Sequence, residues 1–334
     1  MSLALKNNWQ QELPLNWQPT ADLQTLKQRA DILQRIRAFF YARNVMEVET
    51  PLMCRASVTD PFIESIPALY QSHPSNTPEY FYLQTSPEYA MKRLLAAGSG
   101  CIFQICKAFR QGEVGRLHNP EFTMIELYRI GFNQMQLIDE MDALLQEILQ
   151  CPPADRVSYR ELFFRKFNID VFAATLDELK SLALANDIHV NDEIHDKDTW
   201  LNLLMTHCVE PELGHDKPCV IYNFPASQAA LARINPEDPN TAARFEVYYQ
   251  GMELANGFHE LQHAEEQRKR FVANNEKRET LQQTVMPIDE LFIAALSAGL
   301  PDCSGVALGV DRLVMLALRK ETLQEITSFP IERV

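Results

Sequence analysis

Two alternating runs joined by a short polar loop constrain the fold of this chain most. The run CIFQICKAFR covers residues 101–110, and the run FTMIELYRIGF begins at Phe122. Parallel strands need a crossover of a dozen or more residues, so this loop predicts antiparallel neighbours. Side chains two apart in a strand share a face of the sheet. Along the first strand Arg110 shares a face with Ile102, Gln104, Cys106 and Ala108, and along the second Phe122, Met124, Glu126 and Tyr128 share a face.

Further strands are expected at VMEVETP, YFYLQT, KPCVIYNFP and SGVALG, and RFEVYYQGMELANGF reads as a hairpin that ends at Asn256-Gly257. Helical periodicity appears between them over about 20–43, 86–98, 134–150 and 263–280, and residues 53–79 look irregular. Thr20 is expected to cap the first helix and Asn44 to end it. In the second helix Ser86 caps, Pro87 takes the first position and Gly98 ends it. The pattern predicts an α+β fold, a mostly antiparallel sheet flanked by helices.

The domain organisation expected is a tail over residues 1–19 and one large domain over 20–334, with an acidic helical insertion at about 151–216. No apolar run approaches the roughly 20 residues of a membrane span, and the N-terminus lacks the pattern of a secretion signal. The net charge of −14 disfavours broad binding to nucleic-acid phosphates. The seven cysteines indicate reduced thiols in a cytoplasmic protein. Neither common nucleotide-binding fingerprint is present.

Two glutamates of the expected hairpin form a candidate metal site. If Gln250-Gly251 is the turn, Tyr248 faces Glu253, and Glu246 lies two residues away on the same face. Neighbouring carboxylates repel, and Mg2+ bound with nucleotide phosphates relieves such repulsion. The alternative is two exposed glutamates at a hairpin edge.

Arginines near two turns are candidate anion ligands. Arg110 lies at the rim of the first strand pair, with His118 at the other end of its loop, and a guanidinium can hold a phosphate with two hydrogen bonds. An ordinary surface arginine is the alternative. Arg312 lies in the first turn after a strand flanked by Gly305 and Gly309, which suits anions but is a weak signal alone. Glu88, in a first helical turn, is explained equally by the helix dipole.

Taken together and in order, these segments resemble the three motifs of class II aminoacyl-tRNA synthetases. VMEVETP resembles motif 1, which implies a homodimer with Pro51 at its interface, and FRQGEVGRLHNPEFTMIE and GVALGVDRL resemble motifs 2 and 3. The stretches TSPEYAMKRLL, RLHNPEFTMIELY and ELANGFHEL are similar to the lysyl branch. The first 19 residues leave no room for an anticodon-binding domain. The chain is therefore most similar to the elongation factor P–(R)-β-lysine ligases, a family of lysyl-tRNA synthetase paralogues.

This resemblance implies an enzyme that uses ATP and Mg2+ to activate (R)-β-lysine, or lysine, as an aminoacyl adenylate. The acyl group would then pass to a lysine side chain of elongation factor P. The alternatives are a tRNA-charging enzyme, an aspartate–ammonia ligase and a non-catalytic synthetase-like regulator. The aspartate–ammonia ligase is disfavoured, because Glu88 and Glu260 suit a cation and not a substrate carboxylate. tRNA is an unlikely partner without an anticodon-binding domain.

The resemblance also implies roles for particular residues. Arg110 matches a catalytic ligand of the α-phosphate, Arg312 one of the γ-phosphate, and Glu246 and Glu253 match Mg2+ ligands. The full ATP set is Arg110, Gln111, Gly112, Glu113, His118, Asn119, Phe122, Glu253, Leu254, Gly309 and Arg312. Glu88 and Glu260 match the acids that hold the substrate's ammonium. The full substrate set is Ser86, Pro87, Glu88, Tyr128, Asn256, Glu260 and Ala307.

Three positions depart from the synthetase pattern. Ser86 and Ala307 stand where lysyl-tRNA synthetases typically have Ala and Gly, and a methyl or hydroxyl group in a tight pocket shifts substrate preference by about 1–3 kcal/mol. Motif 2 usually reads R-N-E, whereas here Gly112 stands in place of the acid and Glu113 follows one residue later. If Glu113 substitutes imperfectly, Gly112→Glu should leave ATP binding unchanged or tighter. No general base for the transfer step is identifiable.

Overall fold

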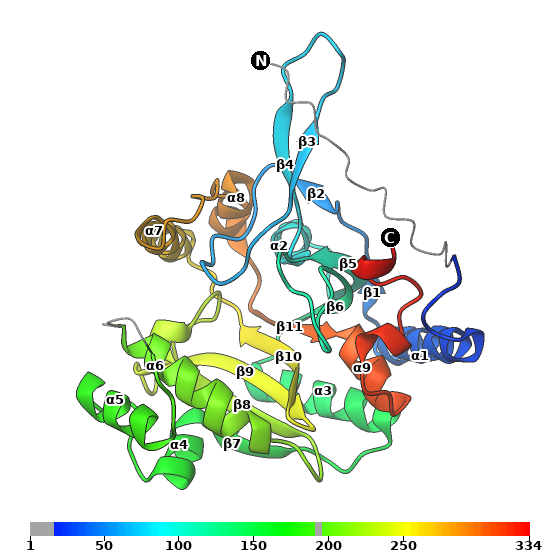
Figure 1. Ribbon diagram of the computed structural model, residues 1–334. Coiled ribbons are helices and arrows are strands. Elements are labelled where there is room, and N and C mark those ends of the chain that lie inside the picture. The colour runs from blue at the N-terminus through cyan, green and yellow to red at the C-terminus, as the bar shows by residue number, and fades with distance from the viewer. Residues whose placement is uncertain (1–16, 191–195) are drawn as a thin grey trace.

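An eight-stranded sheet forms the centre of the computed structural model, which describes residues 17–190 and 196–334 (Figure 1). Its strand order is β1-β5-β6-β11-β10-β9-β8-β7. The outer pairs β1–β5 and β7–β8 are parallel and all inner pairs are antiparallel, as expected for an α+β fold. The bounds are β1 Met46–Glu47, β5 Ile102–Phe109, β6 Glu121–Ile130, β7 Asp155–Ser158, β8 Cys219–Pro225, β9 Thr241–Tyr249, β10 Met252–His259 and β11 Cys303–Gly309.

The first strand pair of the sequence is confirmed as an antiparallel neighbour pair. Gln104 of β5 lies opposite Glu126 of β6, and Ala108 lies opposite Phe122. On its other side β6 pairs with β11, so that Glu126 also lies opposite Ala307. The strand that begins after the predicted phosphate loop therefore lies beside the strand that leads to Arg312.

Helices cover both faces of this sheet and bury opposite sets of strand residues. On one face α1 (Leu23–Tyr41), α3 (Gln134–Leu149) and α9 (Val310–Ala317) form the main core with Phe103, Leu127, Val247 and Val306. On the other face α2 (Glu88–Ala96), α7 (Ala264–Thr280) and α8 (Glu290–Gly299) pack around Tyr128 and Cys303. Leu127 and Tyr128 are consecutive in β6, so their opposite placement follows from strand alternation.

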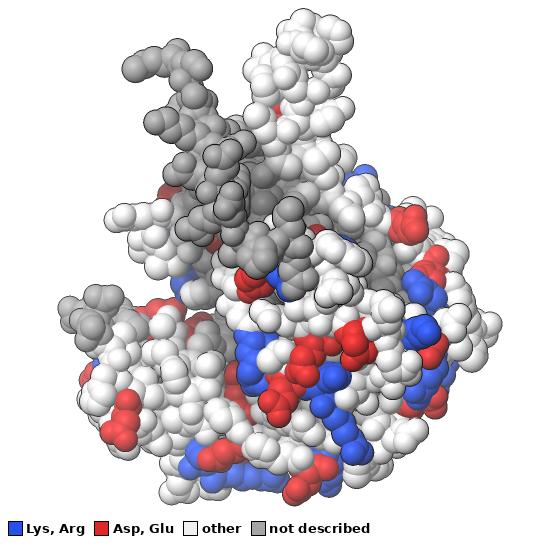
Figure 2. Space-filling model, turned by 45° about the vertical axis from the view of Figure 1, so that its right-hand side comes forward, with Lys and Arg blue, Asp and Glu red and all other residues white. Residues whose placement is uncertain are grey.

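A second sheet stands out from the body of the molecule (Figure 1). It consists of β2 (Met53–Cys54), β4 (Glu79–Leu83) and β3 (Pro67–Tyr70), in that order. The expectation that residues 53–79 are irregular was wrong for β2 and β3, because these short strands lack alternation and owe their form to pairing with β4. The tip between β3 and β4 holds no Lys, Arg, Asp or Glu, whereas charges of both signs intersperse over the rest of the visible face (Figure 2).

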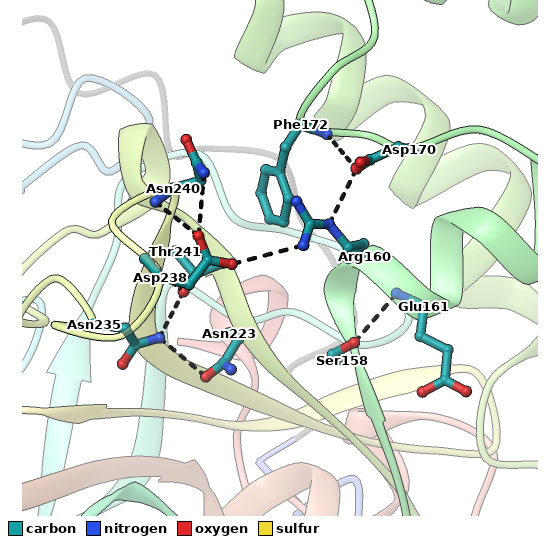
Figure 3. Close-up of polar contacts among 10 residues, drawn as sticks. All are labelled: Ser158, Arg160, Glu161, Asp170, Phe172, Asn223, Asn235, Asp238, Asn240 and Thr241. Carbon is teal, nitrogen blue, oxygen red and sulfur yellow. Dashed lines mark hydrogen bonds and ion pairs between the residues drawn. The ribbon is translucent and has the colours of Figure 1, made fainter.

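The segment predicted as a helical insertion contains α4 (Tyr159–Phe167), α5 (Leu176–Ala185) and α6 (Lys197–Leu204). It also contains the strand β7, which the sequence reading missed and which extends the main sheet beside β8. Its helices share an apolar cluster with Ile221 and Phe224 of β8. On its surface Arg160 joins Asp170 and reaches Asp238, which ties α4 to the loop before β9 (Figure 3).

The ends of the first two helices differ from the prediction. Asp22, not Thr20, caps α1, since its carboxylate accepts from the backbone N–H of Thr25 at 2.7 Å. Pro87 occupies the N-cap position of α2, which has no side-chain cap, so the roles expected of Ser86 and Pro87 were wrong. Proline still suits this place, because the first amides of a helix have no intrahelical partner.

The expected stop signals after these helices are confirmed, and the expected break in the hairpin is not. Asn44 has φ +55° and Gly98 has φ +89°, the left-handed geometry typical of helix ends. Asn256-Gly257 does not end its strand, since β10 continues to His259 and pairs with β11 from Ala255 to His259. The small residue Gly257 is required there because a Cβ would lie 2.4 Å from the ring of Phe245. No helix in the described part of the chain is long and apolar enough to cross a membrane, and all seven cysteines are free thiols.

The side chain of Arg278 in α7 should contribute strongly to stability. It is fully buried, and it donates to the carbonyl oxygens of Thr284 and Asp60 and to the carboxylate of Glu64, each at 2.7 Å. Arg278→Met leaves these acceptors unpaired and should lower the free energy of unfolding by about 3 kcal/mol. Urea unfolding followed by circular dichroism measures this. The matched control is Lys269→Met, an exposed position of the same helix, and equal midpoints for the two variants would contradict the assignment.

Candidate active site

Two adjoining cavities open on the sheet face that carries Glu126 and Tyr128. Their volumes are about 430 and 440 Å³. The first, here called the acidic chamber, is lined by Glu88 and Glu126, and the second, the arginine chamber, is lined by Arg244 and Arg312. Both are lined by the same seam of residues, so they form one cleft with two compartments. The seam consists of Asp60, Ile63, Arg110, Met124, Ala230, Asn256 and Ala307.

Arg110 stands at the junction of the two chambers. Its guanidinium lies 5.1 Å from the centre of the Phe122 ring and 3.6 Å from the Glu113 carboxylate. Its Nε is buried without a hydrogen-bond partner. Buried donors in native proteins almost always have partners, so an unused one on a side chain that lines both chambers indicates a ligand. An anion between the chambers would satisfy it.

Arg312 projects into the arginine chamber from the first turn of α9. It donates at 2.6 Å to the backbone carbonyl of Glu253 and lies 2.7 Å from Nε2 of His118. Partial burial, aided by the charge of Arg312, lowers the pKa of His118 below its usual value. At neutral pH His118 is therefore an uncharged acceptor for Arg312. The strand-to-helix turn and the loop from motif 2 thus meet in one contact.

The hairpin register predicted for the two glutamates is confirmed at its turn. Tyr249 pairs with Met252 and Tyr248 with Glu253, and a bulge at the next residue then places Glu246 opposite Asn256. Glu246 accepts a 2.5 Å hydrogen bond from the hydroxyl of Tyr248 and forms an ion pair with Arg244. Sequence reasoning missed Arg244 because one cation two residues before an acid on a strand is a common surface pattern.

Glu246 and Glu253 both line the arginine chamber, and their environment suits a cation. Desolvation in the chamber wall, together with the charge of Glu246, raises the pKa of Glu253. Because the Glu253 side chain still reaches solvent, we expect this rise to be smaller than for an enclosed carboxylate. Among the described residues no cluster of three or more His, Cys, Asp or Glu could hold a metal. Mg2+ fits such a pair, since it commonly uses one or two carboxylates together with phosphate oxygens and water.

Most of the residues predicted to bind ATP line the arginine chamber, and two do not. Those brought together are Arg110, Glu113, His118, Asn119, Phe122, Glu253, Leu254, Gly309 and Arg312. Gln111 lies outside the lining and donates its backbone N–H to the Glu64 carbonyl at 2.9 Å. Gly112 has φ +80°, so any side chain there is strained by about 1 kcal/mol. The expected effect of Gly112→Glu on ATP binding must include this backbone cost.

The residues predicted to bind the second substrate divide into two groups. Ser86, Glu88, Asn256 and Ala307 line the acidic chamber. Pro87, Tyr128 and Glu260 are buried and lie outside its lining, although Tyr128 and Glu260 come close to it. A Cβ on Gly305 would lie 2.3 Å from the Tyr128 ring and 2.5 Å from a carboxylate oxygen of Glu260. Glycine at this position therefore lets the chamber wall lie directly against both side chains.

Glu126 is a chamber acid that sequence reasoning did not propose. It is 4% exposed, accepts a 2.8 Å hydrogen bond from the Tyr128 hydroxyl, and leaves its other oxygen buried without a partner. Burial, with the charge of Glu88, raises its pKa to about 8. The signal available was its place on the same strand face as Phe122 and Tyr128, but alternation alone does not separate a site residue from an exposed one.

Lys92 is a third residue that was missed, after Arg244 and Glu126. Its ammonium lies 2.6 Å from Glu88 and 2.6 Å from Glu260, and its side chain is 1% exposed. Glu88 and Lys92 are four residues apart on α2, which reads as an ordinary surface ion pair of a helix. Only the fold shows that a second acid, Glu260, directly after β10, reaches the same ammonium.

The geometry of two arginines, two hairpin glutamates and an acidic pocket on a mainly antiparallel sheet agrees with a family comparison. The model of the class II tRNA synthetases (D, K and N) matches residues 13–333. The chain therefore belongs to this family. A curated relative from Vibrio cholerae serotype O1, named elongation factor P–(R)-beta-lysine ligase, is 52% identical to this chain. The match covers 95% of this chain and 98% of the relative. Relatives with the same name from Klebsiella pneumoniae strain 342 and Salmonella typhi are 51% and 50% identical to it, also over 95% of this chain and 98% of each relative. Within the class II family, the chain belongs to these ligases.

The ionisation of Glu126 should make stability depend on pH. Its pKa is raised from 4.5 to about 8 in the folded protein, so the folded state binds the proton more tightly than the unfolded state over that window. The protonated Glu126 side chain contributes its full stability below pH 4.5, the pKa of this group in the unfolded chain. That contribution is lost as the pH rises to about 8, the pKa in the folded protein. Glu126→Gln should therefore become more stable relative to the wild type as the pH rises through this window.

Urea unfolding at several pH values measures the difference. Glu121→Gln, at an exposed position of the same strand, is the control and should show no comparable trend. A Glu126→Gln advantage that is constant with pH would show that Glu126 ionises normally.

Proposed function

We propose that this enzyme activates (R)-β-lysine, or lysine, with ATP as an aminoacyl adenylate and transfers the acyl group to a lysine side chain of elongation factor P. The observation that carries the proposal is the cleft of two chambers, one suited to phosphate and one to ammonium, which meet at Arg110. An amino acid joined to AMP has this distribution of charge. The names of the relatives supply the particular amino acid and the protein acceptor.

ATP would lie in the arginine chamber. Arg110, whose Nε is an unused buried donor, would bind the α-phosphate, and Arg312 would bind the γ-phosphate. Phe122 offers an aromatic face for adenine, beside His118, Asn119, Leu254 and Gly309. Gln111 and Gly112 would act through the backbone of their loop, since neither lines the chamber. Glu113, paired with Arg110, is the acid available near the adenine side.

Glu246 and Glu253 would hold Mg2+ in this chamber. When bound, the ion neutralises charge on the phosphates and fixes their orientation. The protein's own contribution is to keep two like charges side by side, with Tyr248 and Arg244 fixing the orientation of Glu246. This arrangement is stable only where a cation or a proton offsets the repulsion.

The amino acid would lie in the acidic chamber with its carboxylate toward Arg110. Glu88 and Glu126 line this chamber and would face the two ammonium groups of a diamino acid, with Glu260 directly behind. Ser86, Asn256 and Ala307 complete the wall, and the buried residues Pro87 and Tyr128 lie outside the lining.

The reaction follows as two displacements. A carboxylate oxygen of the amino acid attacks the α-phosphorus of ATP, the bond to the bridging oxygen breaks, and pyrophosphate leaves. Arg110 offsets charge that develops on the transferring group, and Arg312 holds the departing pyrophosphate. The uncharged amine of the target lysine then attacks the acyl carbon, an amide forms, the nitrogen gives up one proton to solvent, and AMP leaves with the electron pair of the broken acyl–phosphate anhydride bond. No covalent intermediate with the enzyme is required.

The remaining predictions concern assembly and partners. We propose a cytoplasmic homodimer that meets elongation factor P at the open side of the cleft and does not charge tRNA. The tail over 1–19 lies mostly outside the described residues. The division into one domain with an insertion at 151–216 stays a proposal, supported by the separate apolar cluster of that segment.

A pyrophosphate-exchange assay tests the activation step, and the mass of elongation factor P tests the transfer. The wild type should exchange label with (R)-β-lysine or lysine and should add one acyl group to the acceptor. Arg110→Met should lower exchange by about 100-fold or more, because one preorganised charge contact to the transition state is lost. Lys107→Met, an exposed residue of the same strand, should leave exchange unchanged. Absence of exchange in the wild type, or lysine delivered to tRNA instead, would overturn the proposal.

Ala307 should set the choice between the two lysine isomers. It lies opposite Glu126 on one neighbouring strand and opposite Asn256 on the other, and it lines both chambers. Ala307→Gly removes one methyl group from the wall. The free-energy difference that corresponds to the ratio of kcat/KM for the two isomers should shift by about 1–3 kcal/mol in favour of α-lysine. Exchange measured with each isomer gives the ratio. Equal changes for both isomers would show that Ala307 does not discriminate between them.

A further inference from the structure

A fully enclosed lysine joins two acids behind the wall of the acidic chamber. The ammonium of Lys92 lies 2.6 Å from Oε1 of Glu88 and 2.6 Å from Oε2 of Glu260, and the side chains of Lys92 and Glu260 are each 1% exposed. Three charges removed from water are costly unless their geometry is good. Three apolar side chains of similar size would fill the same space without this cost, so the charged groups indicate a role other than packing.

The surroundings place Lys92 on the protein side of the acids. Its ammonium lies about 6 Å from the ring centres of Tyr128 and Phe292, and Lys92 is absent from the lining of both chambers. Glu88, by contrast, lines the acidic chamber and contacts Lys92 as well. The titratable and charged groups nearest this cluster are Glu88 and Tyr89 on α2, Glu126 and Tyr128 on β6, Glu260 after β10, Cys303 on β11, and Arg233 and Asp302 at its edge. Asp60, Arg110, Glu266 and Arg270 line the same chamber, Glu266 and Arg270 as an ion pair, and Asp289 acts on Tyr89 from the start of α8.

The formal charge of the cluster matches a particular class of ligand. Glu88, Glu126 and Glu260 bring three carboxylates, and Lys92 brings one ammonium. In the empty chamber the raised pKa values of Glu126 and Glu260 keep part of this charge neutralised by protons at neutral pH. The formal charge reaches minus two when a bound cation keeps all three carboxylates ionised. The two ammonium groups of lysine or β-lysine carry a charge of plus two. A mono-amino acid would leave one buried carboxylate without a partner, which is costly. The resident ammonium is therefore part of what suits the chamber to a diamino acid.

We infer that Lys92 is a positioning residue of the amino-acid pocket, whose ammonium joins Glu88 and Glu260 into one fixed unit and sets the charge that the chamber offers to a diamino substrate. This inference rests on the proposed function. The opposite assignment is that the Lys92 ammonium occupies the place of the substrate and must leave when the substrate binds. The enclosure of Lys92 and its place outside the lining favour the positioning role.

The ionisation of the cluster agrees with this role. Burial alone would lower the pKa of Lys92, but Glu260 and Glu88 outweigh burial and raise it, so the ammonium stays charged. Burial raises the pKa of Glu260 to about 7, and Lys92 is the largest influence that opposes this rise. Without Lys92 the Glu260 carboxylate would hold its proton to higher pH, and the chamber would lose charge at neutral pH.

Lys92→Gln tests the inference, since glutamine can still donate hydrogen bonds but carries no charge. In pyrophosphate exchange near pH 7, the KM for lysine or (R)-β-lysine should rise about 30-fold while the KM for ATP stays within about 2-fold. This deficit should shrink as the pH is raised to about 9, because the carboxylates regain their charge. The control is Arg93→Gln, the next residue of the same helix, which is exposed and should behave as the wild type. An unchanged amino-acid KM, or a lower one as competition would give, overturns the inference.

Lys92→Arg carries the test if the glutamine variant does not fold, which thermal unfolding reports. The positive charge is kept but its point of contact moves, so we expect the wild-type pH dependence with an amino-acid KM raised about 10-fold. A wild-type KM in this variant would show that the position of the ammonium does not matter. Failure of the proposed function looks different. The wild type would then show no exchange, and calorimetry with lysine would show no binding that the Lys92 variants could weaken.

Discussion

The antiparallel pairing of β6 with β11 is the contact on which the site depends. The strand β6 follows the loop after Arg110, in the first half of the chain, whereas β11 lies near the C-terminus. Their pairing places Tyr128 opposite Gly305 and Glu126 opposite Ala307. Because a slip of one residue would turn every side chain to the other face, this register decides which residues face the cleft. It also brings Arg312, at the start of α9, to the loop that follows Arg110. Neither chamber would form without it.

A second contact fixes the hairpin that supplies Glu253. The turn residues Gln250 and Gly251 donate their backbone N–H groups to the carbonyls of Gly214 and Leu213 at 2.8 and 2.9 Å. These acceptors end the segment that the sequence marks as an insertion. Glu210 of the same segment receives the hydroxyl of Tyr248 at 3.3 Å, and this hydroxyl also binds Glu246. The segment therefore holds the hairpin at its turn and at one of its carboxylates.

The main strands and the chemistry of the arginine chamber could be predicted from the sequence, because both follow from local patterns of residues. Alternation and loop length predicted β5, β6 and the hairpin, and the hairpin turn placed Glu246 and Glu253 on one face. Lys92 and Glu126 were out of reach for a physical reason: their significance lies in which distant acids and hydroxyls they meet, and their own neighbours in sequence look ordinary. The same holds for Asp60 and Ile63, which line both chambers from a stretch without periodicity.

The ends of the main sheet have a consequence for the behaviour of the protein in solution. The sheet finishes on one side with β1, of 2 residues, and on the other with β7, of 4 residues. Exposed strand edges offer unpaired amides and carbonyls to other chains, and very short edge strands limit that template. An eight-stranded sheet that ends in this way presents little backbone for a foreign strand to extend, so its edges should resist aggregation even at high concentration.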